Sequence, residues 1–188
     1  MAQAYKINPS LPDGAYFIPL KTQPLSTESS KFHTNTAPIY GEPILLDELR
    51  LNTNTTMDKI VERGQVGEVP IPVHDHLCVE STELRKEHDG AKKNLSDQCD
   101  KGRKINGWWG NYLGMILIRY GSSIAWTCNY SSDEQHCAPN EIDNAYEQIM
   151  TLCKAKSVYT SGGQVCAKKW KKCYGHSTFT SDICGNYA

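Results

Sequence analysis

The chain has 188 residues, eight cysteines and a formal net charge of −1. This length predicts one domain, or one domain with a substantial arm. No apolar run approaches the length that crosses a bilayer, so we expect no transmembrane segment. Residues 1–3 lack the basic start and apolar run of a secretory leader, which indicates a mature form with an added or retained methionine.

The N-terminal part differs in kind from the rest of the chain. Residues 1–77 contain no cysteine and eight of the nine prolines. This composition predicts an arm, residues 1–77, that wraps a disulfide-bonded body, residues 78–188; a propeptide is the alternative. We expect short strands at residues 15–19 and 44–46, which their prolines would confine to sheet edges, and a short helix at residues 57–63.

The cysteines predict an oxidising environment. Their even number and the absence of C-x-x-C pairs favour four disulfides over a zinc site, and therefore a secreted, extracellular protein. Glycosylation sequons at Asn54, Asn94 and Asn129 are compatible with secretion. The eight residues expected to pair are Cys78, Cys99, Cys128, Cys137, Cys153, Cys166, Cys173 and Cys184.

A first helix is predicted at residues 80–98, with Ser81 or Thr82 as its N-cap. Spacings of three and four residues place a mainly apolar stripe on one face. His88 belongs to this stripe, and we expect it at the rim of the core with a backbone or water partner. The stripe comprises Leu84, His88, Ala91, Leu95 and Cys99.

The most apolar part of the chain predicts a central β-hairpin. Two runs, residues 113–120 and 124–130, flank Gly121, and glycine at the first position of a two-residue turn suits type II′. The first run is apolar on both faces, as in a strand buried on both sides. In the glycine-flanked loop before it, Trp108 and Trp109 either lie partly buried under the arm or form an exposed binding anchor.

A second helix is predicted at residues 139–153, because Pro139 stands at its first position and an apolar stripe follows at helical spacing. We expect the hairpin face that carries Trp126 to meet the part of this stripe that contains Tyr146 and Ile149. After the helix, residues 164–174 alternate like a strand, and lysines on both faces predict an edge position.

Geometry excludes some disulfides, since the Cα atoms of a bridge lie at most about 7 Å apart. Cys78 and Cys99 bracket the first predicted helix, roughly 25 Å long at the α-helical rise, and Cys137 and Cys153 bracket the second, so neither pair is expected. If residues 164–174 form one strand, Cys166 and Cys173 lie roughly 23 Å apart and are also excluded. Cys128 with Cys137 remains open, and the other pairings cannot be deduced.

Together these elements predict an α+β fold, an antiparallel sheet with two helices packed on one face. The run GSSIAWTCNY, Cys137, the helix beginning at Glu141, Cys153, WKKCYG and Cys184 resemble a group of small secreted fungal proteins. Many of these are candidate effectors of plant pathogens, and their fold is similar to that of the killer toxin KP4. The resemblance covers about residues 78–188. The long arm and the additional pair Cys166 and Cys173 depart from that pattern.

The leading functional hypothesis is a secreted effector or virulence protein that binds a host extracellular protein in the apoplast, with protease inhibition as one form. Residues 151–188 carry a net charge of +5, which is either a solvated strand face or a contact patch for an acidic partner. We expect a monomer without a nucleic-acid partner. The candidate contact residues are Lys168, Lys169, Lys171, Lys172, Trp108, Trp109, Asp133, Glu134, Gln135 and His136.

Two other functional classes are weighed against this hypothesis. One is a KP4-like toxin that acts on a membrane channel through the lysine-rich strand. The other is a small hydrolase such as a ribonuclease, built from His88 or His136 with Glu134. G-x-S-x-G, P-loop and H-E-x-x-H motifs are absent from the sequence, so we expect no enzyme and no cofactor. His74 and His76 lack an evident third ligand, and we expect no metal site.

Overall fold

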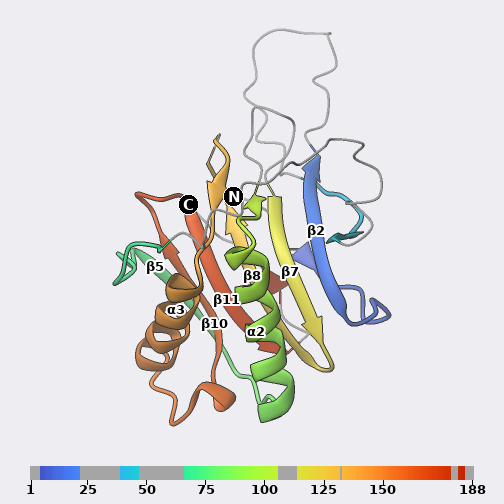
Figure 1. Ribbon diagram of the computed structural model, residues 1–188. Coiled ribbons are helices and arrows are strands. Elements are labelled where there is room, and N and C mark those ends of the chain that lie inside the picture. The colour runs from blue at the N-terminus through green and yellow to red at the C-terminus, as the bar shows by residue number, and fades with distance from the viewer. Residues whose placement is uncertain are drawn as a thin grey trace, which may run out of the picture.

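The computed structural model describes residues 5–21, 39–46, 66–105, 114–131, 133–178 and 182–184. Within these residues the main sheet has the strand order β3-β2-β7-β8-β11-β10-β5, with β4 also paired to β2, and every pairing is antiparallel. The helices α2 and α3 lie on one face of this sheet (Figure 1). The predicted α+β class, an antiparallel sheet with two helices packed on one face, is confirmed.

The main-sheet strands are β2 (Gly14–Lys21), β3 (Ile39–Tyr40), β4 (Ile44–Leu45), β5 (Asp75–Val79), β7 (Gly114–Tyr120), β8 (Ser123–Asn129), β10 (Gly162–Ala167) and β11 (Lys172–Thr178). Two small antiparallel pairs complete the described strands: β1 (Tyr5–Lys6) with β12 (Asp182–Ile183), and β6 (Lys104–Ile105) with β9 (Gln135–His136). The helical elements are α2 (Arg85–Asp100), α3 (Pro139–Leu152) and the 3-10 turn η2 (Val158–Thr160).

The predicted hairpin is the centre of the sheet. Strands β7 and β8 pair from Met115 opposite Cys128 to Tyr120 opposite Ser123. Gly121 has φ +62°, and Ser122 beside it stays at negative φ, as a type II′ turn requires. Every side chain of β8 is buried, because each face of the sheet is covered by a separate apolar cluster.

The helices cover only one of these clusters. It contains Ile116, Ala125 and Tyr174 from the sheet and Tyr146 and Ile149 from α3. Trp126 belongs to the second cluster, on the opposite face, so the predicted contact between its face and the Tyr146–Ile149 stripe is wrong. The alternation of residues along β8 was correct, but both faces are apolar, and alternation does not say which face the helices cover.

The second cluster is covered by segments from both ends of the chain. Tyr5 and Ile7 lie over it beside β12, and Tyr16 and Ile18 contribute from β2. Trp126 fits here because Gly175 stands opposite it on β11: a Cβ at position 175 would lie 2.3 Å from the indole ring. The described N-terminal residues are therefore packed against the disulfide-bonded part of the chain.

Both predicted N-terminal strands exist, as β2 and β4, but the predicted edge position is wrong for β2, which pairs with β7 on one side and with β3 and β4 on the other. Strand β2 extends beyond the predicted residues 15–19 and pairs with β7 from Gly14 to Pro19. Arg119 of β7 also holds the preceding loop, since its guanidinium donates to the carbonyl oxygens of Pro9 and Leu11. The predicted helix at residues 57–63, Asn54, Trp108 and Trp109 lie outside the described residues.

The first helix begins five residues later than predicted. Its N-cap is Leu84, which makes no side-chain cap and is exposed rather than part of the buried stripe. The predicted caps Ser81 and Thr82 are wrong: the Ser81 hydroxyl instead accepts the Thr178 amide at the end of β11. The second helix is confirmed: Pro139 lies in its first turn, and it ends at Leu152, one residue earlier than predicted. The predicted stripe is buried from Ile142 to Ile149, and its end, Leu152 and Cys153, is half-buried.

The strand predicted at residues 164–174 is wrong, because this stretch is a hairpin of two strands, β10 and β11. The chain reverses at residues 168–171, where the Trp170 amide bonds to the Ala167 carbonyl oxygen at 3.1 Å and Lys171 takes φ +52°. Strand β11 therefore lies inside the sheet, between β8 and β10, rather than at an edge. The sequence hides this turn, since it contains neither glycine nor proline.

All eight cysteines are paired, as predicted. The bridges join Cys78 to Cys153, Cys99 to Cys137, Cys128 to Cys184 and Cys166 to Cys173. Both exclusions across a helix are confirmed. The exclusion of Cys166 with Cys173 is wrong: the hairpin places them directly opposite each other, with their Cα atoms 4.1 Å apart.

Candidate functional site

The turn between β10 and β11 carries most of the predicted lysine patch. Lys168, Lys169 and Lys171 are exposed, and Trp170 between them is half-buried. The Cys166–Cys173 disulfide closes the base of this turn, joining the two strands immediately before they separate. Three cations thus project from a short, covalently closed turn.

The predicted contact loop before α3 lies against this turn. Asp133 and Glu134 are exposed, whereas Gln135 and His136 are half-buried and form β9. The Gln135 side-chain amide donates to the Trp170 carbonyl oxygen. Two segments that are remote in the sequence therefore form one surface, which we call the loop surface: residues 133–136 and 168–171.

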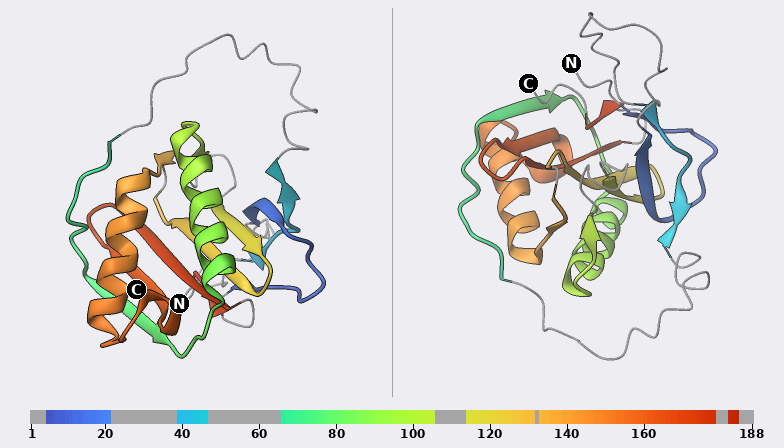
Figure 2. Two further views of the ribbon diagram at one scale, coloured as in Figure 1. Left: turned by 60° about the horizontal axis from the view of Figure 1, so that its bottom comes forward. Right: turned by 90° about the horizontal axis from the view of Figure 1, so that it is seen from above.

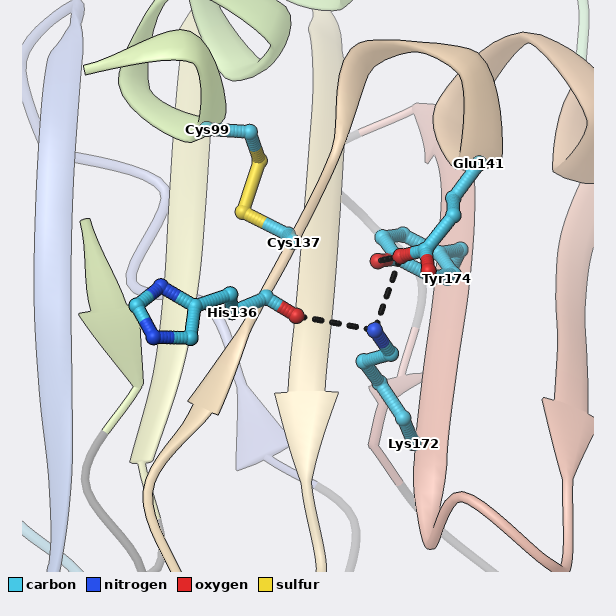
Figure 3. Close-up of a disulfide and its surroundings, with 6 residues drawn as sticks. All are labelled: Cys99, His136, Cys137, Glu141, Lys172 and Tyr174. Carbon is cyan, nitrogen blue, oxygen red and sulfur yellow. Dashed lines mark hydrogen bonds and ion pairs between the residues drawn. A yellow bond between two sulfur atoms is a disulfide. The ribbon is translucent and has the colours of Figure 1, made fainter. Parts of the chain in front are cut away.

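Lys172 joins the two halves of the loop surface from inside. Although it was predicted on an edge strand, it is buried, and its Nζ lies 2.8 Å from the Glu141 carboxylate and 2.8 Å from the His136 carbonyl oxygen (Figure 3). Its ammonium also lies 5.5 Å and 5.4 Å from the ring centroids of Trp170 and Tyr174. The cation therefore contacts the turn, the loop and the first turn of α3 at once.

A tyrosine completes the environment of this ion pair. The Tyr174 hydroxyl donates to the same oxygen of Glu141 that Lys172 contacts. Burial, followed by the negative charge of Glu141, raises the pKa of Tyr174 well above its ordinary value, so the phenol remains a donor. The Glu141 carboxylate is thus held by two donors from β11.

Covalent bonds also restrain the loop. Cys137, next to His136, is bridged to Cys99 at the end of α2 (Figure 3). The buried Asn129 amide donates to the carbonyl oxygens of Ile105 and Asp133, at 2.9 Å and 2.8 Å. The loop surface is consequently braced on both sides, by disulfides and by buried polar contacts.

Sequence reasoning missed the residues that join the two segments. Glu141 was recognised only as the beginning of a helix, and Tyr174 only as the last residue of the strand predicted at residues 164–174. The only signal for Glu141 was its place in the first turn of a helix whose buried stripe begins one residue later, at Ile142. Its partner Lys172 is 31 residues away in the sequence, which no local pattern reveals.

A second polar group lies inside the molecule, beneath η2. The Glu83 carboxylate lies 2.9 Å from Nδ1 of His176, and both side chains are fully buried. Tyr146 stacks on His176 with ring centroids 4.1 Å apart. His88 meets the rings of Tyr146, Tyr159 and His176 edge-on.

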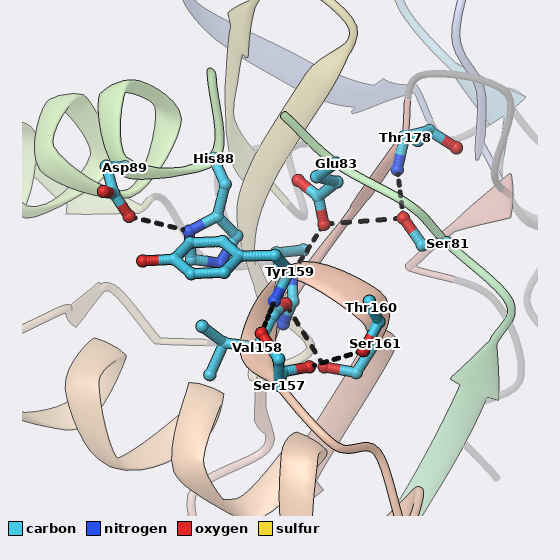
Figure 4. Close-up of polar contacts among 11 residues, drawn as sticks. Ser81, Glu83, His88, Asp89, Ser157, Val158, Tyr159, Thr160, Ser161 and Thr178 are labelled. Atoms are coloured by element: carbon cyan, nitrogen blue, oxygen red, sulfur yellow. Dashed lines mark hydrogen bonds and ion pairs between the residues drawn. The ribbon is translucent and has the colours of Figure 1, made fainter. Parts of the chain in front are cut away.

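The predicted rim position of His88 is therefore wrong. It is 2% exposed and bonds through Nδ1 to the Asp89 carboxylate at 3.1 Å (Figure 4). Desolvation lowers its pKa. The helix predicted from residue 80 placed this position correctly on the buried stripe, but the tyrosines and His176 that cover it come from distant elements.

This buried group offers acid–base side chains but no exposed face. Among the described residues, Glu83 Oε2, His88 Nε2, His176 Nε2 and Tyr146 OH have no hydrogen-bond partner. The two imidazoles considered for a ribonuclease lie on different elements, His88 on α2 and His136 on β9. Neither is paired with Glu134 by a described contact.

Other candidate features carry less chemistry. His74, Asp75 and His76 are exposed at the start of β5, and the described residues contain no group of three histidine, cysteine or acidic side chains arranged to hold a metal. In the described part of the chain, no helix combines the length and apolar character needed to cross a membrane.

Comparison of the chain with protein-family models, with curated proteins and with solved structures found no match.

Proposed function

We propose that this protein is secreted and binds a host extracellular protein through the loop surface, in the manner of a fungal effector. The observation that carries the proposal is the buried Lys172, which ties the two predicted contact segments to one carboxylate of α3. A surface held in one geometry before binding loses little conformational entropy when the partner docks. Four disulfides are typical of proteins that work in an oxidising compartment.

The charges of the loop surface indicate the character of the partner. Lys168, Lys169 and Lys171 are exposed and form no ion pair with other described residues. An acidic patch on the partner could therefore form ion pairs with all three. Asp133 and Glu134 border them and would orient the partner by repelling a misplaced acidic group. Protease inhibition remains one form of the proposal. The turn at residues 168–171, which we call the lysine turn, would then act through its side chains. Hydrogen bonds from the Trp170 and Lys171 amides hold its backbone in a turn conformation, which prevents the extended conformation of a protease substrate.

The resemblance to KP4-like fungal proteins agrees with this proposal at the level of architecture. The antiparallel sheet and the two helices on one face (Figure 1) are what that resemblance implies. One of the two departures from its pattern lies at the proposed site: the additional pair Cys166–Cys173 closes the lysine turn. We therefore favour a binding role for the turn over the channel toxin.

The test is a pull-down from plant apoplastic fluid with immobilised protein. The variant Lys168→Ala/Lys169→Ala/Lys171→Ala should lose the captured partner, and capture by the native protein should fall as salt rises, since exposed charges are screened within about 8 Å at physiological ionic strength. The matched control is Lys86→Ala/Lys154→Ala/Lys156→Ala, which removes three exposed lysines elsewhere. Equal capture by both variants would contradict the proposal, as would identical capture at low and high salt.

A further inference from the structure

A second exposed segment runs along α3 and then forms the margin of the sheet. It comprises residues 66–80, which we call the acidic edge, and it ends in strand β5 and the residue after it. Both views in Figure 2 show this segment passing outside α3 before it joins the sheet. It lies outside the loop surface and has no part in the function proposed above.

Side chains of α3 form hydrogen bonds with the backbone of the acidic edge. The Asn140 side chain accepts the Gly67 amide at 2.9 Å and donates to the Gly67 carbonyl oxygen at 2.7 Å. One helical turn later, Asn144 accepts the Ile71 amide at 2.8 Å, and the Ile71 side chain is buried in the core. Between Gly67 and Ile71 the segment is thus held in one conformation although no strand pairs with it. Binding of a partner would therefore cost it little conformational entropy.

The outward side chains of the acidic edge are apolar, acidic or imidazole, the last from His74 and His76. Among the described residues only four large apolar side chains are exposed, and three belong to this segment: Val66 at 90%, Val69 at 47% and Leu77 at 40%. Its carboxylates, Glu68, Asp75 and Glu80, are also exposed, and residues 66–80 contain no lysine or arginine. A partner that matches this surface has apolar and basic side chains.

The backbone of β5 provides the remaining contact. Within the described part of the chain β5 pairs only with β10, so its outer edge has no strand beside it. Natural edge strands commonly carry lysine, proline or a bulge that prevents pairing, whereas β5 reads DHLCV. An extended peptide can add to such an edge through main-chain hydrogen bonds, while alternate side chains give specificity.

We propose that β5 takes up an extended, basic segment of a partner protein as an additional strand, with Asp75 facing its cations and Leu77 its apolar side chains. The charge of the acidic edge selects against acidic segments. The adjoining residues Val66 and Val69 extend the apolar contact beyond the strand. This surface and the loop surface take partners of opposite charge, so they can be tested separately.

The probe is a short synthetic peptide of the repeat Lys-Lys-Val-Val, which presents lysine and valine in turn on each face of a strand; it is titrated into the intact protein and followed by amide hydrogen exchange. We expect slower exchange at β5, and weakening of binding by about tenfold or more in the variant Asp75→Lys/Leu77→Lys. A peptide of the repeat Glu-Glu-Val-Val should not bind. An N-methylated lysine–valine peptide, which keeps its charge but loses alternate amide donors, should also fail to bind.

Two further variants separate strand addition from other effects. Leu84→Lys changes an exposed apolar residue at the start of α2 and should leave peptide binding unchanged. The inference is overturned if the N-methylated peptide binds as well as its parent. It is also overturned if sedimentation shows a dimer that Leu77→Lys abolishes, because the occupant of the edge would then be a second copy of this chain.

Discussion

Replacing Lys172 by methionine is expected to destabilise the protein strongly. The substitution keeps a long apolar chain but removes the ammonium, and it leaves the Glu141 carboxylate buried with the Tyr174 hydroxyl as its remaining described donor. The Lys172 and Glu141 side chains are each 7% exposed, so solvent screens this charge little. Removal of one partner from such a buried pair costs about 3–5 kcal/mol.

This loss is a large part of the total, since domains are typically stable by only about 5–15 kcal/mol. Urea denaturation followed by near-ultraviolet circular dichroism, with disulfides intact, measures it. The double variant Glu141→Gln/Lys172→Met should recover much of the stability, because no uncompensated charge then remains buried. The exposed neighbour provides the control, and Lys169→Met should change the free energy of unfolding by less than about 0.5 kcal/mol. If Lys172→Met resembled Lys169→Met, the central role given to the buried ion pair would be refuted.

Three other measurements test separate parts of the structure. Trp126→Ala should cost about 3–5 kcal/mol in urea denaturation, as deletion of a buried large aromatic does, and a midpoint equal to that of the native protein would contradict its place in the second cluster. His88 has a lowered pKa in the folded protein, so its stabilising contribution is present above the unfolded value of about 6.5 and is lost as pH falls below it; His88→Gln should flatten this part of the stability–pH curve, and an unchanged curve would refute the assignment. Asn129 should be free of glycan in natively folded protein from a eukaryotic secretory host, because its buried amide donates to Ile105 and Asp133, and mass spectrometry showing a glycan there would disprove this packing.

Local patterns predicted the central hairpin and α3 because each is encoded by its own residues. The hairpin has two apolar runs and a glycine where the backbone needs positive φ. Helix α3 has a proline in its first turn and an uninterrupted apolar stripe. Such signals depend on short-range geometry, which neither packing nor chain topology alters here.

The hairpin of β10 and β11 was missed because its turn has unusual chemistry. Lys171 takes the left-handed conformation that glycine or asparagine usually supplies, so no turn residue marks the reversal. One wrong strand then had two consequences: Lys172 was expected at an edge, and the bridge between Cys166 and Cys173 was excluded by length.

The loop surface was predicted only in pieces. Exposed lysines and a polar loop identified residues 168–171 and 133–136 as separate candidates. Their union depends on the contacts of Lys172 with Glu141 and with the His136 carbonyl, which lie 31 and 36 residues from it along the chain. Long-range pairing of this kind depends on the whole fold, and a single sequence carries no local signal for it.

The most direct test of the proposed binding role is a hydrogen-exchange footprint of the protein bound to its captured apoplastic partner. Contacts of Gln135 and Lys172 join the two halves of the loop surface, so residues 133–136 and 168–171 should gain protection together, with the lysine turn protected on both sides of Trp170. Protection confined to one of the two segments, or found only in other parts of the chain, would contradict the account.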